Sequence, residues 1–337
     1  MLTTPFGRRT WLAAVTACTA ALLAPTAEAQ KAVEFRYGHM NPPNSAAGMQ
    51  AQWLADAIAK NTAGQVKVTV YPSSQLGKLQ ELAEAVSTGT IALSHNTAGG
   101  IGSLHEPFGA LDTPYLYRDV DHLMKVMDVG GPVMKKLNEG LIKAAGVRVL
   151  YAYYFGTRQL TSNKAITQPS DLTGLKIRAI PFPIYMSAVQ GMGAIPVPVD
   201  WSEVPTALAT GQVAGQENPV NVVLSSKLYE KQSHMMLTSH IMNAQLVVIN
   251  EKAWQALSAA QREQIGKAAD EVRRKATDMV QNDEGAELEK LKALKMTVIG
   301  PANGLKLDAF KSSVNKLVQE KFGAKFGDLY RDIAAVK

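Results

Sequence analysis

The chain has 337 residues, of which 46% are hydrophobic, and 35 basic and 29 acidic residues give it a formal net charge of +6. Its Lys and Arg residues are scattered rather than gathered into patches, which argues against nucleic-acid binding. The length exceeds what one hydrophobic core usually serves, so we expect two domains.

The first 29 residues are typical of a secretory signal. Arg8-Arg9 supplies the positive region, Trp11–Leu23 is mostly apolar, and Ala27–Ala29 fits the small-residue cleavage pattern. A transmembrane anchor is the alternative, but the apolar stretch is shorter than the roughly 20 residues that a span needs. Cleavage after Ala29 predicts a periplasmic protein that starts at Gln30.

The export route stays open, because Arg8-Arg9-Thr-Trp-Leu also resembles a twin-arginine signal. A lipid anchor at Cys18 is disfavoured, because the apolar run continues through Leu22-Leu23. Cys18 is the only cysteine, so cleavage would leave a chain with no disulfide, no thiolate metal site and no cysteine nucleophile. We expect neither a metal nor a cofactor.

Beyond the signal, predicted strands and helices alternate. Strands are predicted at 33–37, 66–71, 147–154 and around Ile177, and helices at 46–59, 79–86, 120–127, 132–144 and 184–189. This order predicts an α/β fold with parallel strands and crossover helices. Ligands of such sheets bind beyond the carboxyl ends of the strands, where we expect Asn41, Asn96, Arg158 and Arg178.

One long helix is predicted near the C-terminus. Ser258 and Gln261 form a capping box, and apolar residues follow at heptad spacing at Ile265, Val272 and Met279. About 36 residues at about 1.5 Å each span roughly 54 Å, more than the roughly 40 Å breadth of a domain of half this size. The helix is therefore predicted to bridge two lobes; the alternative is two helices broken near Gly285.

Two arginines are candidate anion-binding residues. Arg178 stands at the end of a short buried strand, beside Ile177 and Ile180. Arg158 follows the apolar strand that ends at Phe155, where we expect the chain to leave the sheet. Either arginine alone would more often be an ion-paired or solvated residue than a ligand contact.

Two further side chains have two interpretations each. Trp201 stands at the entrance of a short helix, where a tryptophan packs or forms a platform for a ligand. Asn218 precedes Pro219 after a predicted strand, so its amide either binds a ligand or forms a local turn.

Several motifs occur together and in order: Gly-Thr-Arg158-Gln, Asp171-Leu-Thr-Gly-Leu-Lys-Ile-Arg178, Ser202-Glu-Val and Gly215-Gln-Glu-Asn218-Pro. The set resembles the extracytoplasmic solute-binding proteins of TRAP (tripartite ATP-independent periplasmic) transporters, the dicarboxylate-binding-protein-like family. The resemblance implies a two-lobed, Venus-flytrap periplasmic binding protein, expected to be a monomer, which delivers an organic acid to membrane subunits of a transporter. It implies that Arg178 forms a salt bridge with the carboxylate, that Arg158 and Asn218 add hydrogen bonds, and that Trp201 lines the cleft.

The expected lobes are 30–155 with 244–282, and 156–243 with 283–337. The stretch Thr90–Gly100 lacks the acidic residue common in the family and the charged residues of its sialic-acid branch, which disfavours sialic acid as the ligand. We expect His95 to be a packed neutral side chain, and Asn96 and Thr97 to contact the ligand.

Two other functions stay open: a secreted hydrolase, and a binding module that passes its ligand to a receptor. The sequence contains no His-Glu-x-x-His motif, no Gly-x-Ser-x-Gly motif and no phosphate loop, so no enzyme is predicted. Dicarboxylates, 2-oxo acids, sugar acids and aromatic acids all carry the carboxylate that Arg178 would bind.

Overall fold

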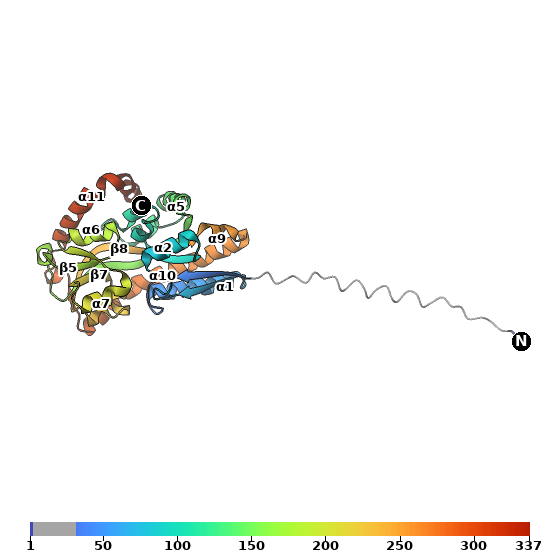
Figure 1. Ribbon diagram of the computed structural model, residues 1–337, viewed down its shortest axis with the longest axis horizontal. Coiled ribbons are helices and arrows are strands. Elements are labelled where there is room, and N and C mark those ends of the chain that lie inside the picture. The colour runs from blue at the N-terminus through green and yellow to red at the C-terminus, as the bar shows by residue number, and fades with distance from the viewer. Residues whose placement is uncertain (3–31) are drawn as a thin grey trace. The chain divides into compact units, whose positions relative to one another are not determined.

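One mixed sheet organises residues 33–337 in the computed structural model, which describes residues 1–2 and 32–337 (Figure 1). The strands lie in the order β2-β1-β3-β8-β4-β7-β5-β6, and β9 pairs with β8. Their bounds are β1 Val33–Gly38, β2 Val66–Tyr71, β3 Leu93–Thr97, β4 Val147–Ser162, β5 Lys176–Ala179, β6 Ile195–Pro198, β7 Gly215–Pro219, β8 His234–Asn250 and β9 Thr297–Ile299. Apart from Met1 and Leu2, the predicted signal and its cleavage site lie outside the described residues.

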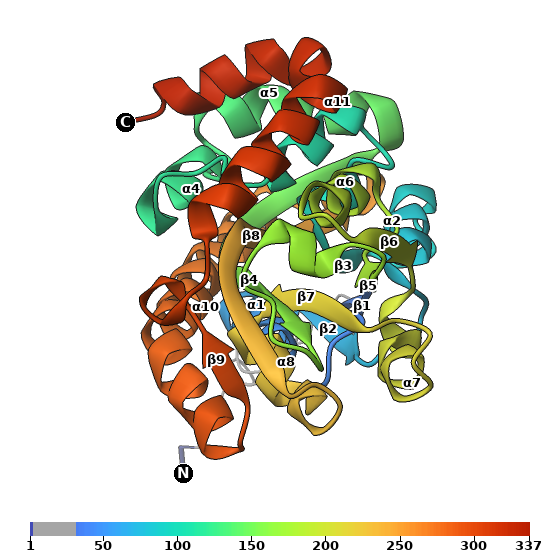
Figure 2. The ribbon, with the colours of Figure 1, turned by 90° about the vertical axis from the view of Figure 1, so that its left-hand side faces the viewer.

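The sheet is not parallel throughout, so that part of the sequence prediction is wrong. β1 pairs in parallel with β2 and β3, and β5 pairs in parallel with β6 and β7. Between these two groups the long strands β4 and β8 run antiparallel, side by side (Figure 2). The direction of β8 in the sheet depends on its pairing with β4, about 90 positions earlier in the chain. A local sequence pattern cannot predict such a pairing.

Arg158 lies inside β4 rather than where the chain leaves the sheet, which corrects the expectation for this strand. The β4–β8 register shifts between Tyr154 and Gly156 and again between Arg158 and Leu160. Gly156 has φ +121°, a conformation that favours glycine, and a Cβ there would lie 2.6 Å from Cβ of Pro219. These irregularities bend the strand while its ladder continues to Ser162.

The helices agree with the predicted pattern and extend it. Their bounds are α1 Ala46–Asn61, α2 Leu79–Thr88, α3 Ala98–Ile101, α4 Val120–Val126, α5 Pro132–Ala145, α6 Pro183–Gly191, α7 Val204–Ala209, α8 Val220–Ser225, α9 Glu251–Ala256, α10 Ala259–Ala293 and α11 Leu307–Ala335. Short 3-10 helices are η1 Glu106–Asp112, η2 Pro169–Leu172, η3 Trp201–Glu203, η4 Leu228–Glu230 and η5 Pro301–Asn303. Ser45 caps α1, because its Oγ accepts a hydrogen bond from the Gly48 N–H at 3.1 Å.

Helix α10 is continuous over 35 residues, so the alternative of two helices broken at Gly285 is wrong. Ser258 and Gln261 form the predicted capping box at its start. Ile265 packs with the hydrophobic residues of β1 and α1, whereas Leu291 packs with those of α7 and α8. The helix therefore contacts hydrophobic clusters at both ends of the sheet. Figure 2 shows α10 on the same side of the molecule as β9.

Candidate functional site

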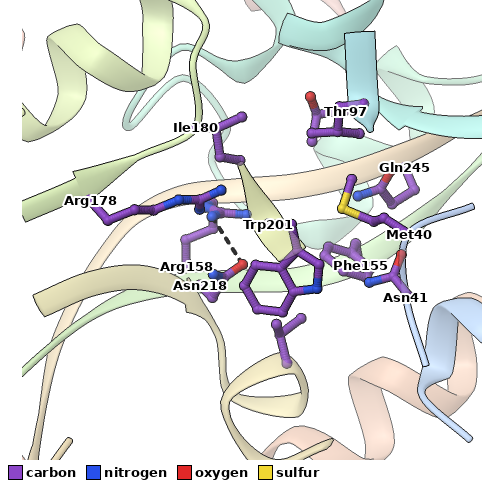
Figure 3. A pocket seen from close by; sticks show the side chains of 12 residues that line it. Met40, Asn41, Thr97, Phe155, Arg158, Arg178, Ile180, Trp201, Asn218 and Gln245 are labelled. Carbon is purple, nitrogen blue, oxygen red and sulfur yellow. Dashed lines mark hydrogen bonds between the residues drawn. The ribbon is translucent and has the colours of Figure 1, made fainter. Parts of the chain in front are cut away.

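A small cavity of about 30 Å³ lies where the parallel strands of the two groups end. Asn41 follows β1, Thr97 ends β3, Arg178 stands near the end of β5 and Asn218 near the end of β7. Figure 3 shows the lining side chains, which are Met40, Asn41, Leu79, Thr97, Phe155, Arg158, Arg178, Ile180, Trp201, Asn218, Val222 and Gln245. The carboxyl ends of parallel strands are where α/β sheets usually bind ligands.

Six of the seven predicted site residues line this cavity: Asn41, Thr97, Arg158, Arg178, Trp201 and Asn218. Asn96 does not. Its Nδ2 donates a hydrogen bond to the Leu79 carbonyl at 2.8 Å, so it holds a residue of the cavity wall in place instead.

Arg178 is a buried cation with unused hydrogen-bonding capacity. It is 1% exposed, and its Nε donates to the Val199 carbonyl at 2.8 Å. Its Nη1 has no partner among residues 32–337. Burial lowers the pKa of Arg178 to about 10, so the guanidinium is still protonated at neutral pH. The arrangement leaves a charged donor at the cavity wall.

Arg158 is equally buried, but Glu217 neutralises it. Its Nε and Nη2 both donate to the Glu217 carboxylate, the latter at 2.9 Å to Oε1, and Nη2 also donates to the Glu217 carbonyl at 2.7 Å. Burial alone would lower the pKa of Arg158, but the adjacent Glu217 charge raises it. Burial alone would raise the pKa of Glu217, and Arg158 and His240 lower it instead. The pair is therefore fully ionised.

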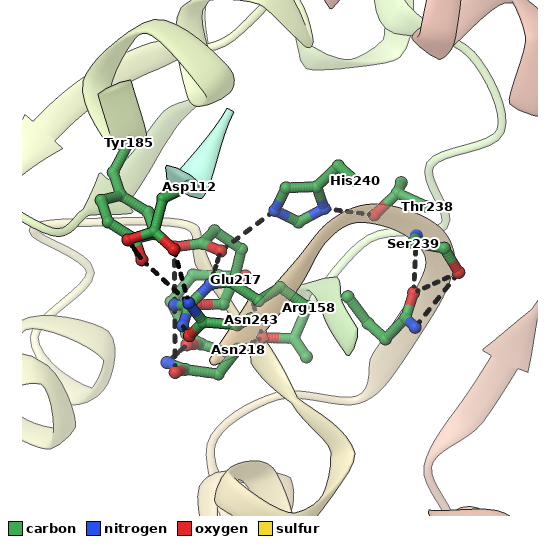
Figure 4. A network of polar contacts seen from close by, with 12 residues as sticks. Asp112, Arg158, Tyr185, Glu217, Asn218, Thr238, Ser239, His240 and Asn243 are labelled. Carbon is green, nitrogen blue, oxygen red and sulfur yellow. Dashed lines mark hydrogen bonds and ion pairs between the residues drawn. The ribbon is translucent and has the colours of Figure 1, made fainter. Parts of the chain in front are cut away.

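A polar network extends from this ion pair (Figure 4). Arg158 Nη1 donates to Asn243 Oδ1 at 3.2 Å, and Asn243 Nδ2 donates to Asp112 Oδ1 at 2.9 Å. Tyr185 donates to Asp112 Oδ2 at 2.7 Å. Burial nevertheless raises the pKa of Asp112 to about 6. The network fixes the position of Arg158 from the side away from the cavity.

Trp201 and Asn218 complete this side of the cavity. The Trp201 ring centroid lies 5.8 Å from Cζ of Arg178, within cation–π range. Asn218 Oδ1 accepts from Arg158 Nη2 at 3.1 Å, and its Nδ2 donates to Gln216. Trp201 thus packs and also lines the cavity, and its role as a platform for a ligand stays a prediction.

The opposite side of the cavity is held by a neutral histidine. His95 Nε2 lies 3.0 Å from Asn41 Oδ1, and its Nδ1 lies 3.2 Å from Gln50 Nε2. Because an amide nitrogen only donates, Nδ1 accepts and Nε2 carries the proton. Burial lowers the pKa of His95 well below its usual value, which confirms the prediction of a packed neutral side chain.

Sequence reasoning missed several residues of the site. Gln245 lines the cavity from the middle of β8, and Phe155 does so from β4. Glu217 and Asp112, which balance the charge of Arg158, were also missed. The motif Gly215-Gln-Glu-Asn218-Pro contained Glu217, but its partner became visible only when β4 and β7 were paired, with Arg158 opposite Pro219.

The described residues contain neither a cluster of metal ligands nor a helix that could span a membrane. No group of three or more His, Cys, Asp or Glu side chains there could hold a metal ion. None of the helices in residues 32–337 combines the length and the apolar character needed to cross a membrane.

One known protein family matches most of the chain. The family described as bacterial extracellular solute-binding protein, family 7, matches residues 37–325. The chain belongs to this family. It is a periplasmic solute-binding protein of the TRAP type, a class of binding proteins and not of enzymes, so a secreted hydrolase no longer fits.

Individual relatives support this assignment, because the similarity extends along most of this chain and most of each relative. The 2,3-diketo-L-gulonate-binding periplasmic protein of Escherichia coli strain K12 is 30% identical over 304 residues, which cover 90% of this chain and 91% of the relative. A TRAP solute-binding protein of Polaromonas sp. JS666, solved with D-erythronate, is 31% identical with a TM-score of 0.84 and covers 90% of this chain and 99% of its own. One from Sulfurospirillum deleyianum, solved with succinate, is 27% identical with a TM-score of 0.82 and the same coverage.

Proposed function

We propose that this protein captures a small organic acid through a salt bridge between the acid's carboxylate and Arg178, and delivers it to the membrane subunits of a TRAP transporter. The observation that carries the proposal is the unpaired state of Arg178. Its Nη1 is buried without a partner in residues 32–337, while Glu217 neutralises the neighbouring Arg158. A buried cation without a counter-charge binds an anion favourably, because the anion supplies the missing charge partner.

The chemistry of the guanidinium suits a carboxylate. Its planar fork matches the two carboxylate oxygens, and charge-assisted hydrogen bonds are roughly twice as strong as neutral ones. The bond from Arg178 Nε to the Val199 carbonyl fixes the plane of the fork before the ligand arrives. In this proposal Arg158 and Asn218 add hydrogen bonds, Trp201 covers the carboxylate, and Asn41 and Thr97 contact the remainder of the ligand.

Ligand entry requires the cavity to open. Its volume of about 30 Å³ holds one or two water molecules, less than an organic acid needs. We propose that lobe I (30–155 with 244–282) and lobe II (156–243 with 283–337) separate about the irregular parts of β4 and β8. Ligand contacts made only in the shut form would then shift the population toward closure.

The relatives support an organic acid as the ligand. Three of them are named for, or were solved with, 2,3-diketo-L-gulonate, D-erythronate and succinate, and all three compounds are carboxylates.

We also propose that export removes the signal after Ala29. The N-terminal sequence of the mature protein from a periplasmic extract would test this.

A thermal-shift screen tests the binding proposal. Purified protein would be heated with single acids from a panel of dicarboxylates, 2-oxo acids, sugar acids and aromatic acids. An acid at about 100 times its dissociation constant adds roughly 2.7 kcal/mol to the free energy of unfolding, which raises the melting temperature. The Arg178→Ala variant should lose this shift. A panel without any shift, or a shift that survives in the variant, would contradict the proposal.

A further inference from the structure

We infer that the ligand is a monocarboxylic acid that carries hydroxyl groups, and that Gln245 selects for them. This inference rests on the proposed function, because it assumes that Arg178 takes the carboxylate. It goes further in naming the class of acid and a residue that discriminates within it.

The first observation is the charge of the cavity wall. Arg158 and Arg178 are the cationic side chains among the residues that line the cavity, and Glu217 neutralises Arg158. Figure 3 shows both arginines together with Asn218, while Thr97, Gln245 and Asn41 lie on the other side. That other side carries no cation. The second carboxylate of a dicarboxylic acid would lie there buried and unpaired, which is unfavourable.

The second observation is the unsatisfied amide of Gln245. The side chain is 4% exposed and lines the cavity, and its Oε1 has no hydrogen-bond partner in the described part of the chain. Gln245 pairs directly with Thr97 in the β3–β8 ladder, so the two side chains lie next to each other on one face. Buried amides are normally hydrogen-bonded, and a ligand in this cavity would supply the missing donor.

The third observation is the hydrogen-bonding capacity of the neighbours. Asn41 Oδ1 is held by His95, which leaves its Nδ2 as the end that can meet a ligand. Thr97 Oγ1 accepts from the Gly100 N–H at 3.0 Å, which leaves its hydroxyl hydrogen to donate. With the Gln245 amide, this wall presents both donors and an acceptor.

A hydroxyl group matches that combination, because it donates and accepts at once. A carboxylate only accepts, so it would leave the Gln245 oxygen unsatisfied. An unsubstituted alkyl chain would leave the Gln245 oxygen, the Asn41 Nδ2 and the Thr97 hydroxyl hydrogen without a ligand partner. The wall therefore favours a hydroxylated acid over both alternatives.

Calorimetry on the wild-type protein tests the class of acid. D-Erythronate, succinate and butyrate have four carbons each and differ in carrying hydroxyls, a second carboxylate or neither. D-Galactonate and D-glucuronate would extend the hydroxylated set. We expect the best hydroxylated acid to bind at least about tenfold more tightly than succinate and butyrate.

The outcomes separate this inference from the proposed function. Equal or tighter binding of succinate or butyrate, lost in Arg178→Ala, would overturn the inference and leave the proposed function intact. Failure of all five acids to bind would overturn the inference, and the proposed function would fall with it only if the whole panel of the thermal-shift screen were also silent.

A second experiment tests Gln245 itself. Gln245→Leu removes the amide at similar volume, and we expect it to lower the ratio of hydroxylated-acid to butyrate affinity about tenfold or more. Gln52→Leu makes the same change at an exposed position of α1, outside the cavity, and should keep the wild-type ratio. An unchanged ratio in Gln245→Leu would overturn its role. The wild-type panel decides the class of acid even if this variant folds poorly.

Discussion

Arg158 and Glu217 form an ion pair in which each side chain is 1% exposed, and the equally buried Arg178 in the same cavity has no carboxylate partner in residues 32–337. Two arginines that look alike in the sequence therefore differ in what they can do. The charge of Arg158 is already balanced by the fold. The charge of Arg178 is available to a ligand.

Removal of the Glu217 carboxylate is expected to destabilise the protein strongly. Glu217→Ala leaves Arg158 as a buried cation without its counter-charge, a change that typically costs about 3–5 kcal/mol. His240, whose Nε2 lies 3.0 Å from Glu217 Oε2, also loses a partner. Urea denaturation followed by circular dichroism would measure the loss as a lower midpoint.

Glu263→Ala is a matched control, because Glu263 pairs with Lys267 on the exposed face of α10. Exposed pairs of this kind contribute little to stability, so its midpoint should stay close to that of the wild type. Similar midpoints for Glu217→Ala and Glu263→Ala would show that the buried pair does not have the structural role assigned to it.

Arg178 is expected to lower the stability of the ligand-free protein while enabling binding. Arg178→Met replaces a buried, partly unsatisfied cation with an apolar side chain, so the ligand-free variant should be as stable as the wild type or more so. Its affinity for the acid should fall by at least about 2 kcal/mol, because the ligand carboxylate loses its charge partner. Thermal melts with and without ligand, together with calorimetry, would separate the two effects.

The Arg178→Lys variant separates the effect of the positive charge from that of the planar guanidinium. Lysine keeps the charge but loses the planar fork, so its affinity should lie between those of the wild type and Arg178→Met. An affinity for Arg178→Lys equal to that of the wild type would mean that a point charge suffices and that the fork does not matter.

Asp112 is expected to make the folded state more stable in mild acid than at neutral pH. Burial raises its pKa from 3.8 to about 6, so the folded protein binds this proton more tightly than the unfolded chain does. The resulting stabilisation is fully present below about pH 4 and is lost as the pH rises through about 6, a change of about 3 kcal/mol. The difference in unfolding free energy between the wild type and Asp112→Asn should follow that curve. A pH-independent difference would contradict it.

Asp171 offers a control of opposite sign. Hydrogen bonds from the Thr167 N–H, at 2.8 Å, and from Gln168 lower the pKa of Asp171. Its contribution is therefore present above the pKa of the unfolded chain and is lost as the pH falls. The difference between the wild type and Asp171→Asn should accordingly decrease toward acid pH, whereas that for Asp112→Asn increases.

The sequence was sufficient to find half of the twelve residues that line the cavity, because those residues follow recognisable local signals. Arg178 and Asn218 stand near the ends of short strands, and the capping box of α10 is a local pattern that does not depend on the rest of the fold. Asn96 lies outside the cavity lining, because neighbouring residues of a strand point to opposite faces. A shift of one position separates Thr97, in the wall, from Asn96, behind it.

Long-range pairing set the limit on prediction. Gln245 lies in a run of apolar residues of β8, and only its pairing with Thr97 shows that it reaches the cavity. Glu217 and Asp112 gain their roles from contacts with side chains that are 59 or more positions away in the sequence. Patterns within one segment carry no information on such contacts.

A surface ion pair beside Trp201 provides the last prediction. Lys78 Nζ, at the start of α2, lies 2.7 Å from Asp200 Oδ2 and 3.0 Å from Glu203 Oε1, so in the proposed division it joins the two lobes at the mouth of the cavity. Hydrogen bonds to both carboxylates raise the pKa of Lys78, which keeps it charged.

Because these contacts of Lys78 must break before the cleft opens, Lys78→Met should speed ligand dissociation about two- to fivefold, the modest effect typical of exposed pairs. Stopped-flow measurements at low and high salt would detect this, since salt should accelerate release from the wild type and have less effect on the variant. Lys267→Met, on the exposed face of α10, should release ligand at the wild-type rate. Equal rates for all three proteins would mean that the Lys78 contact does not hold the cleft shut.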